Sequence, residues 1–136
     1  MSMASCVFCD ISTNQIISHI IYQNNDVICF LPLKPQVYGH TIIATKQHYQ
    51  DIFFIPDTAM SSVMNAIKFL AIHYKKQLGA QGINLLHASG TAAQQSVLHF
   101  HIHMLPRFEQ DNLNLWPNLP NSSYDIEALA KKLRIQ

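Results

Sequence analysis

Three histidines alternate with apolar residues in the segment His99-Phe100-His101-Ile102-His103, and Met104 continues the apolar series. Successive side chains of an extended strand point to opposite faces of a sheet. The alternation therefore predicts a strand with three imidazoles on one face and Phe100, Ile102 and Met104 packed into the interior on the other. Imidazole titrates near neutral pH and serves as nucleophile, proton carrier or metal ligand. Three such rings in a row predict a reaction surface, because ordinary packing does not call for them.

The bulk properties of the chain exclude several classes of protein. Its 136 residues suffice for one domain that buries roughly two-thirds of the extended-chain surface. A net charge of +1 offers no electrostatic footprint for duplex nucleic acid or for an anionic membrane. The sequence has no apolar run long enough to span a bilayer, and residues 1–5 lack the basic start and apolar core of a signal peptide. We expect a cytoplasmic protein with reduced thiols.

The pattern of apolar and turn residues predicts an α+β domain. Apolar side chains recur at three- and four-residue steps between Asp57 and Leu78, which predicts an amphipathic helix that Gly79 ends. A short helix is expected at 124–133, and a polar loop at 89–95 is expected to connect the last two strands. Strands are predicted at 26–31, 40–45, 83–88 and 98–105. One long helix over an antiparallel sheet is the expected architecture.

The histidine row is compatible with two kinds of chemistry. The imidazoles could bind a transition metal, or they could perform nucleophilic and acid–base catalysis on a phosphoryl or acyl group. Gln94, Gln95 and Ser96 directly precede the strand and offer amide, hydroxyl and main-chain donors beside His101, which favours catalysis on phosphate oxygens.

The three cysteines suggest a metal site of their own. Their odd number argues against a disulfide framework. Cys6 and Cys9 have the C-x-x-C spacing that allows two thiolates to hold one metal ion. A redox pair, or two small buried residues near the terminus, is the alternative interpretation of that spacing.

Three motifs together resemble the histidine triad (HIT) superfamily of nucleotide hydrolases and transferases. The run from Gln95 to Leu105 is similar to the family signature, the segment from Gly39 through Lys46 to His48 to its second signature, and the Cys pair to its zinc-containing branch. The resemblance implies a HIT-like fold with a five-stranded antiparallel sheet that pairs as a homodimer. We expect a single domain over 1–136, with its core at about 6–107 and a tail at 108–136.

The resemblance also implies the roles of individual residues. His101 would attack the α-phosphorus of a nucleotide and form a transient nucleotidyl-imidazole, while His103 would hydrogen-bond the phosphate and His40 would orient the triad. Gln94, Gln95 and Ser96 would supply further contacts to the phosphate, with Ser96 near the leaving group. One structural zinc ion per chain would be held by four side chains, with no organic cofactor: Cys6, Cys9, His48 and His99.

Two departures from the family pattern affect the expected substrate. Family members often contact the nucleoside through polar side chains at the positions held here by Pro32 and Ala88, and Gln94 stands where the phosphate loop usually has glycine. Dinucleoside polyphosphates and nucleoside phosphoramidates are the expected substrates. A non-catalytic nucleotide-binding or scaffold protein of the same fold is the main alternative, and a zinc-dependent regulatory or storage protein is a third.

Overall fold

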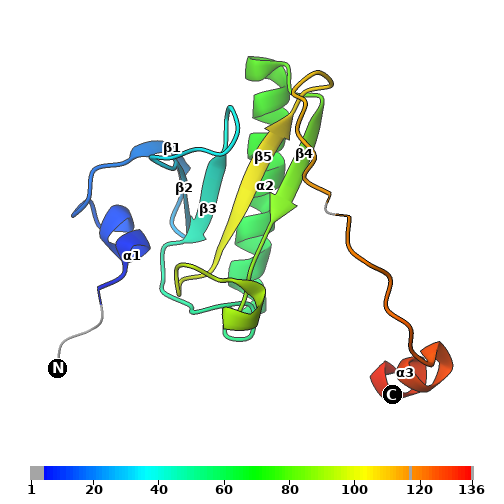
Figure 1. Ribbon diagram of the computed structural model, residues 1–136. Coiled ribbons are helices and arrows are strands. Elements are labelled where there is room, and N and C mark those ends of the chain that lie inside the picture. Colours follow the sequence, from blue (N-terminus) through cyan, green and yellow to red (C-terminus); the bar gives the residue numbers. More distant parts are fainter. Residues whose placement is uncertain (1–4, 117, 136) are drawn as a thin grey trace.

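The computed structural model describes residues 5–116 and 118–135 and has an α+β architecture (Figure 1). A five-stranded sheet in the order β1-β2-β3-β5-β4 is antiparallel at every pairing. The elements, in chain order, are α1 (Val7–Ser12), β1 (His19–Gln23), β2 (Val27–Leu31), β3 (Thr41–Thr45), α2 (Asp57–Leu78), β4 (Gly82–Leu86), the 3-10 turn η1 (Thr91–Ala93), β5 (His101–Arg107) and α3 (Ile126–Leu133). The predicted fold class, the five-stranded sheet and both predicted helices are confirmed.

The two faces of the sheet carry separate hydrophobic clusters. Helix α2 covers one face, where Phe100, Ile102 and Met104 of the histidine segment pack against the stripe from Val63 to Tyr74. On the opposite face the short helix α1 places Phe8 and Ile11 against β2 and β3. Strands β2 and β3 are therefore buried on both faces.

Strand β5 begins three residues later than the sequence predicted. The main-chain N–H of His99 donates to the carbonyl of Val97 (2.8 Å), and that of Phe100 donates to the carbonyl of Tyr49 (2.6 Å). These two bonds hold 97–100 in a bend outside the sheet, so His99 does not lie on the same strand as the other two histidines. The predicted strand at 98–105 is wrong in this respect, and the observed one extends instead to Arg107.

Pro106 lies inside β5 without breaking it. Proline cannot donate to a strand ladder. The last pair between β3 and β5 joins Thr41 to Met104, whereas β4 still pairs with Pro106 through Ile83. Beyond Met104, β5 is paired with β4 but no longer with β3. The N–H that Pro106 lacks would point to the β3 side, where no ladder bond is required.

Two elements have no signal in the sequence. Helix α1 has only six residues, too few for a helical period to be visible, and β1 is an edge strand whose side chains alternate between exposed and half-buried. The main-chain pairing of β1 with β2 places it in the sheet. Both elements depend on tertiary contacts more than on their own pattern.

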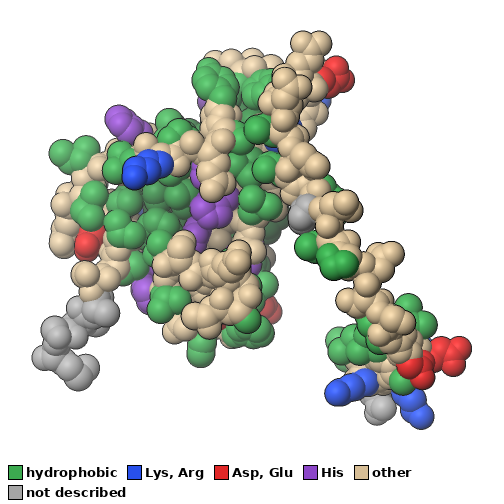
Figure 2. Space-filling model, in the orientation of Figure 1, with side chains coloured by type: hydrophobic (Ala, Val, Ile, Leu, Met, Phe, Trp, Pro, Cys, Tyr) green, Lys and Arg blue, Asp and Glu red, His purple; other side chains and the backbone are tan. Residues whose placement is uncertain are grey.

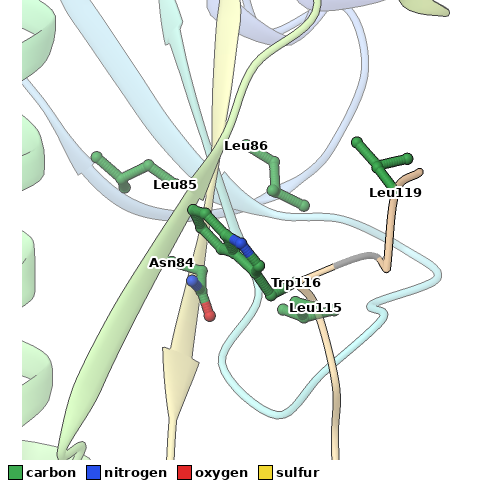
Figure 3. A pocket seen from close by; sticks show the side chains of 6 residues that line it. All are labelled: Asn84, Leu85, Leu86, Leu115, Trp116 and Leu119. Carbon is green, nitrogen blue, oxygen red and sulfur yellow. The ribbon is translucent and has the colours of Figure 1, made fainter. Parts of the chain in front are cut away.

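The chain leaves the sheet after β5 and extends away from it (Figure 1). The guanidinium of Arg107 donates to both carboxylate oxygens of Asp111 and to Oδ1 of Asn84, which fixes the direction of departure. The indole of Trp116 lies over β4 at a pocket of about 270 Å³ (Figure 3). The six side chains lining this pocket are Asn84, Leu85, Leu86, Leu115, Trp116 and Leu119.

Across 5–116 and 118–135, the helices are all too short or too polar to cross a bilayer.

Gly39, which precedes β3, cannot carry a side chain without strain. Its φ is +84°, and a Cβ would lie 2.9 Å from Cγ of Pro106. We expect Gly39→Ala to lower the free energy of unfolding by about 2–4 kcal/mol, because a positive φ and overpacking each cost on the order of 1–3 kcal/mol. Urea denaturation measures the change.

Gly79 is a matched control, because it isolates the cost of the backbone conformation. Its φ is +69°, and within the described chain no atom lies within 4 Å of an added Cβ. Gly79→Ala should therefore cost only about 1–2 kcal/mol. Equal losses in the two variants would show that the close approach of Gly39 to Pro106 has no energetic consequence.

Candidate functional site

Four side chains from three separate parts of the chain converge at one end of the histidine face. Cys6 precedes α1 and Cys9 lies within it, three residues apart and therefore on one side of the helix. His48 follows β3 and His99 precedes β5; because the antiparallel register pairs Ala44 with His101, the end of β3 meets the start of β5. The ligand atoms of all four residues lie within 4.8 Å of one another.

The spacing of these atoms suits a tetrahedral metal ion. Nδ1 of His99 lies 3.3 Å from Sγ of Cys6, 3.6 Å from Sγ of Cys9 and 3.2 Å from Nδ1 of His48. The distance from Sγ of Cys9 to Nδ1 of His48 is 3.5 Å. In a tetrahedral zinc site with bonds of about 2.0 Å to nitrogen and 2.3 Å to sulfur, neighbouring ligand atoms are about 3.3–3.8 Å apart. Two thiolates and two imidazoles would fill this shell.

The surroundings of His99 prepare its ring to accept a metal ion. Nε2 of His99 lies 2.6 Å from the carbonyl oxygen of Thr45, which can only accept a hydrogen bond. Nε2 therefore carries the proton, and Nδ1 presents its lone pair to the cluster. Burial and the neighbouring Cys6 raise the pKa of the Cys9 thiol to about 11, so a bound cation must displace thiol protons.

His101, the first residue of β5, presents its other nitrogen to the site. Its Nδ1 lies 2.7 Å from the carbonyl oxygen of His99 and must donate to it. Burial lowers the pKa of His101, which favours the neutral ring. In that ring the lone pair is on Nε2. The ring packs edge-on against Phe8 and His103, with centroids 4.9 and 5.0 Å away.

His40 and His103 form a directional pair beside His101. The main-chain N–H of Gln36 donates to Nδ1 of His40 (3.1 Å), so the proton of the neutral His40 ring is on Nε2. That Nε2–H donates to Nδ1 of His103 over 2.9 Å. The neutral His103 ring therefore carries its own proton on Nε2, as a donor. One unprotonated ring nitrogen and one N–H donor thus come from alternate residues of a single strand.

The electrostatics of this pair favour the neutral form of both rings. Burial lowers the pKa of His40. For His103, burial, followed by the proximity of His101 and His40, lowers the pKa to about 4. Histidine side chains reach the surface near the middle of the face shown in Figure 2. Burial of most of the His40 and His103 rings disfavours the charged imidazolium.

The lowered pKa of His103 makes folding stability depend on pH. Between pH 6.5, its ordinary pKa, and about pH 4, the unfolded chain binds a proton that the folded chain does not. The contribution of His103 is therefore complete above pH 6.5 and is lost as the pH falls toward 4. Urea midpoints at pH 7.5, 6 and 5 should decrease in that order. The decrease should be smaller in His103→Gln, and equal pH dependence in the two proteins would contradict this origin.

The loop before β5 positions its three polar residues differently. The Gln95 side chain is buried and fully occupied within the protein, since its Oε1 accepts from Gly90 N–H and its Nε2 donates to the carbonyls of Gln50 and Val97. Gln94 and Ser96 are exposed. Gln94 has a φ of +67°, the conformation that glycine adopts more readily. The side chain of Gln95 shapes the loop, and the polar groups left for a ligand come from its neighbours and from the main chain.

Several contributors to this site have no signal in the sequence. The carbonyls of Thr45 and His99 and the N–H of Gln36 determine which nitrogen of each imidazole is protonated. These are main-chain groups, present at every residue, and only the folded geometry selects them. The packing of Phe8 against both His99 and His101 is equally non-local.

Comparisons with known proteins place the chain in a family. A model of the HIT domain matches residues 13–110. An uncharacterized HIT-like protein of Methanocaldococcus jannaschii is 33% identical over 106 residues, which are 78% of this chain and 81% of that protein. An adenylylsulfatase of Arabidopsis thaliana is 30% identical over 94% of this chain and 65% of its own length. An adenosine 5'-monophosphoramidase of Candida albicans is 28% identical over 96% of this chain and 88% of its own length.

Solved structures agree with this placement. A zinc-bound histidine triad family protein from Mycobacterium smegmatis has a TM-score of 0.78 and 30% identity, covering 82% of this chain and 81% of that chain. A HIT family protein from Bacillus anthracis has a TM-score of 0.83 and 31% identity, covering 96% of this chain and 94% of that chain. The zinc-bound structure, together with the four-residue cluster, supports the zinc-binding branch. The chain belongs to the HIT family.

Proposed function

We propose that this protein cleaves or transfers the nucleotidyl group of a nucleotide through a covalent intermediate on His101. The observation that carries the proposal is the pairing of two differently protonated rings. Nε2 of His101 has a lone pair that can attack phosphorus. His103 lies two residues further along the same strand, and its Nε2–H can donate to a phosphate oxygen. Preorganised donors of this kind stabilise the charge that develops in the transition state.

The reaction proceeds in two displacements. Nε2 of His101 forms a bond to the α-phosphorus as the bond from phosphorus to the leaving group breaks. The leaving group departs with the electron pair of that bond and takes up a proton from solvent. The phosphorylated ring is then positively charged, and its Nδ1–H remains bonded to the carbonyl of His99. Water attacks phosphorus, loses a proton and returns the electron pair of the P–N bond to His101. Two easier steps replace one difficult one.

The remaining residues have supporting roles in this proposal. His40 holds His103 so that the Nε2–H of His103 faces the substrate. Ser96, in the exposed loop, would contact the leaving group. Gln94 contributes through the exposed loop, whereas Gln95 acts through its main chain and through the loop shape that its side chain maintains. One structural zinc ion per chain on Cys6, Cys9, His48 and His99 would hold α1 against the start of β5.

Nucleoside phosphoramidates are the substrate class that we favour. Two relatives are named for activities on adenylyl compounds with different leaving groups, an amine in the monophosphoramidase and sulfate in the adenylylsulfatase. Dinucleoside polyphosphates share the same α-phosphorus. Pro32 and Ala88 lack side-chain hydrogen-bonding groups for the nucleoside, so recognition centred on phosphate is consistent with the site.

A substrate comparison with rapid quenching tests the proposal. Adenosine monophosphate linked to a simple amine, and diadenosine tetraphosphate, should be turned over at different rates, and a nucleotidyl-protein adduct should accumulate within one turnover. Mapping should place the adduct on His101. Turnover without any adduct would contradict the mechanism, and tight nucleotide binding without turnover on either substrate would favour the non-catalytic scaffold.

We also propose that two copies of the chain pair. Strand β4 is an edge of the sheet, and it exposes Leu85 and Leu86 beside the tail. Helix α3 exposes Ile126 and Leu133. We place the contact between the two copies on these exposed apolar side chains, because a partner that covered them would remove them from water. Light scattering on the purified protein should give twice the mass of the chain, and a monomer at micromolar concentration would contradict the pairing.

A further inference from the structure

His87 lies outside every motif of the sequence, yet it contacts the main chain of His101. Nδ1 of His87 lies 2.8 Å from the carbonyl oxygen of His101 and must donate to it. Nε2 of the neutral ring is then an acceptor, and the hydroxyl of Ser89 donates to it over 2.6 Å. Ser89 Oγ in turn accepts the main-chain N–H of Ile52 (2.9 Å). Two hydrogen bonds therefore hold the ring, and a third holds the Ser89 hydroxyl that contacts it.

The His87 ring takes the place of a main-chain donor, because His87 follows directly after the end of β4. The β4–β5 pairing ends where Leu86 lies opposite His103. Alternate residues of a strand present their carbonyls to the same neighbour. The carbonyl of His101, two residues before His103, thus faces a place that β4 has already left, and the imidazole of His87 supplies the missing donor. Its ring also packs on Phe100, with centroids 4.7 Å apart.

We propose that His87, oriented by Ser89, is a positioning residue for the nucleophile, an inference that rests on the proposed function. His101 is then held at two points: its ring by the carbonyl of His99, and its own carbonyl by His87. The second contact matters because the direction of Nε2 depends on the position of the His101 backbone as well as on the rotation of its ring. Displacing a reacting group by about 1 Å can cost on the order of a hundredfold in rate.

Two substitutions at position 87 separate hydrogen bonding from packing. His87→Phe keeps a planar ring on Phe100 and removes the donor. His87→Asn removes the ring but places an amide N–H where Nδ1 was. We expect kcat to fall about tenfold in His87→Phe with KM unchanged within about twofold, and to stay within about threefold of wild type in His87→Asn. A kcat for His87→Phe within twofold of wild type, or a His87→Asn variant equally impaired, would overturn the proposal.

A spectroscopic readout makes the test independent of the reaction. The carbonyl ¹³C resonance of His101 should shift in His87→Phe and return toward its wild-type position in His87→Asn. An unshifted resonance in His87→Phe overturns the proposal. If the wild type turns over neither substrate, the proposed function fails, while the resonance still shows whether His87 holds this carbonyl.

Ser89→Ala provides a second variant in case His87→Phe does not fold. It leaves the donor in place but frees the ring to rotate, so kcat should fall about threefold with KM unchanged. A fully active Ser89→Ala protein with an unshifted His101 carbonyl resonance would also overturn the proposal.

Discussion

Replacing His101 with alanine is expected to reduce turnover by about 10⁴-fold or more, because removal of a nucleophile leaves only binding and electrostatic stabilisation. His101 is the first residue of β5, and its unprotonated Nε2 lies beside the N–H donor of His103. Stopped-flow or discontinuous assays with the better of the two substrates measure the loss, and rapid quenching should detect no adduct.

Two further variants make this result interpretable. His101→Asn should be as inactive as His101→Ala while retaining more of the contact with Phe8, whose ring packs on His101. His73→Ala changes an exposed histidine of α2 that has no part in the site, and it should retain full activity. Substantial residual turnover in both His101 variants would assign the nucleophile elsewhere.

Removing the metal site is expected to produce the largest change in stability. Cys9→Ser should abolish stoichiometric zinc and lower the free energy of unfolding by about 4 kcal/mol, the stabilisation given by a ligand present at a thousand times its dissociation constant. For a chain of 136 residues this corresponds to a fall in Tm of more than about 10 °C. Elemental analysis and thermal unfolding measure the two effects.

Cys29→Ala is the matched control for the metal site. Cys29 is the third cysteine, buried in β2 away from the cluster, and burial raises the pKa of its thiol to about 12. This variant should keep one zinc ion per chain and should respond to a chelator as the wild type does. Purified wild-type protein without zinc, or with Tm insensitive to a chelator, would remove the structural role assigned to the four ligands.

Elements with a strong local pattern could be predicted from the sequence. Helix α2 spans Asp57–Leu78 because its apolar stripe faces the sheet, and Gly79 ends it with a φ of +69°. Strands β2 and β3 lie within one residue of their predicted bounds. In contrast, α1 is too short and β1 too exposed for their residues to show a helical or strand period of apolar side chains. The start of β5 was misplaced because the carbonyl of Tyr49 takes the N–H of Phe100, a partner 51 positions away in the chain.

The candidate site divides in the same way. Alternation alone placed His101 and His103 on one face, and the C-x-x-C spacing alone paired Cys6 with Cys9. Adding His48 and His99 to the cysteines required the family resemblance. In the fold, the β3–β5 register and the position of α1 bring all four together.

The sequence by itself determined which residue types are available for chemistry and which faces of α2, β2 and β3 are apolar, because both follow from side-chain identity and local period. Only the tertiary structure decided the protonated nitrogen of each histidine, since the partners of His40, His99, His101 and His103 include main-chain groups brought together by folding. An imidazole has two nitrogens of nearly equal basicity. Its neighbours, and not its place in a motif, determine which one is free to react.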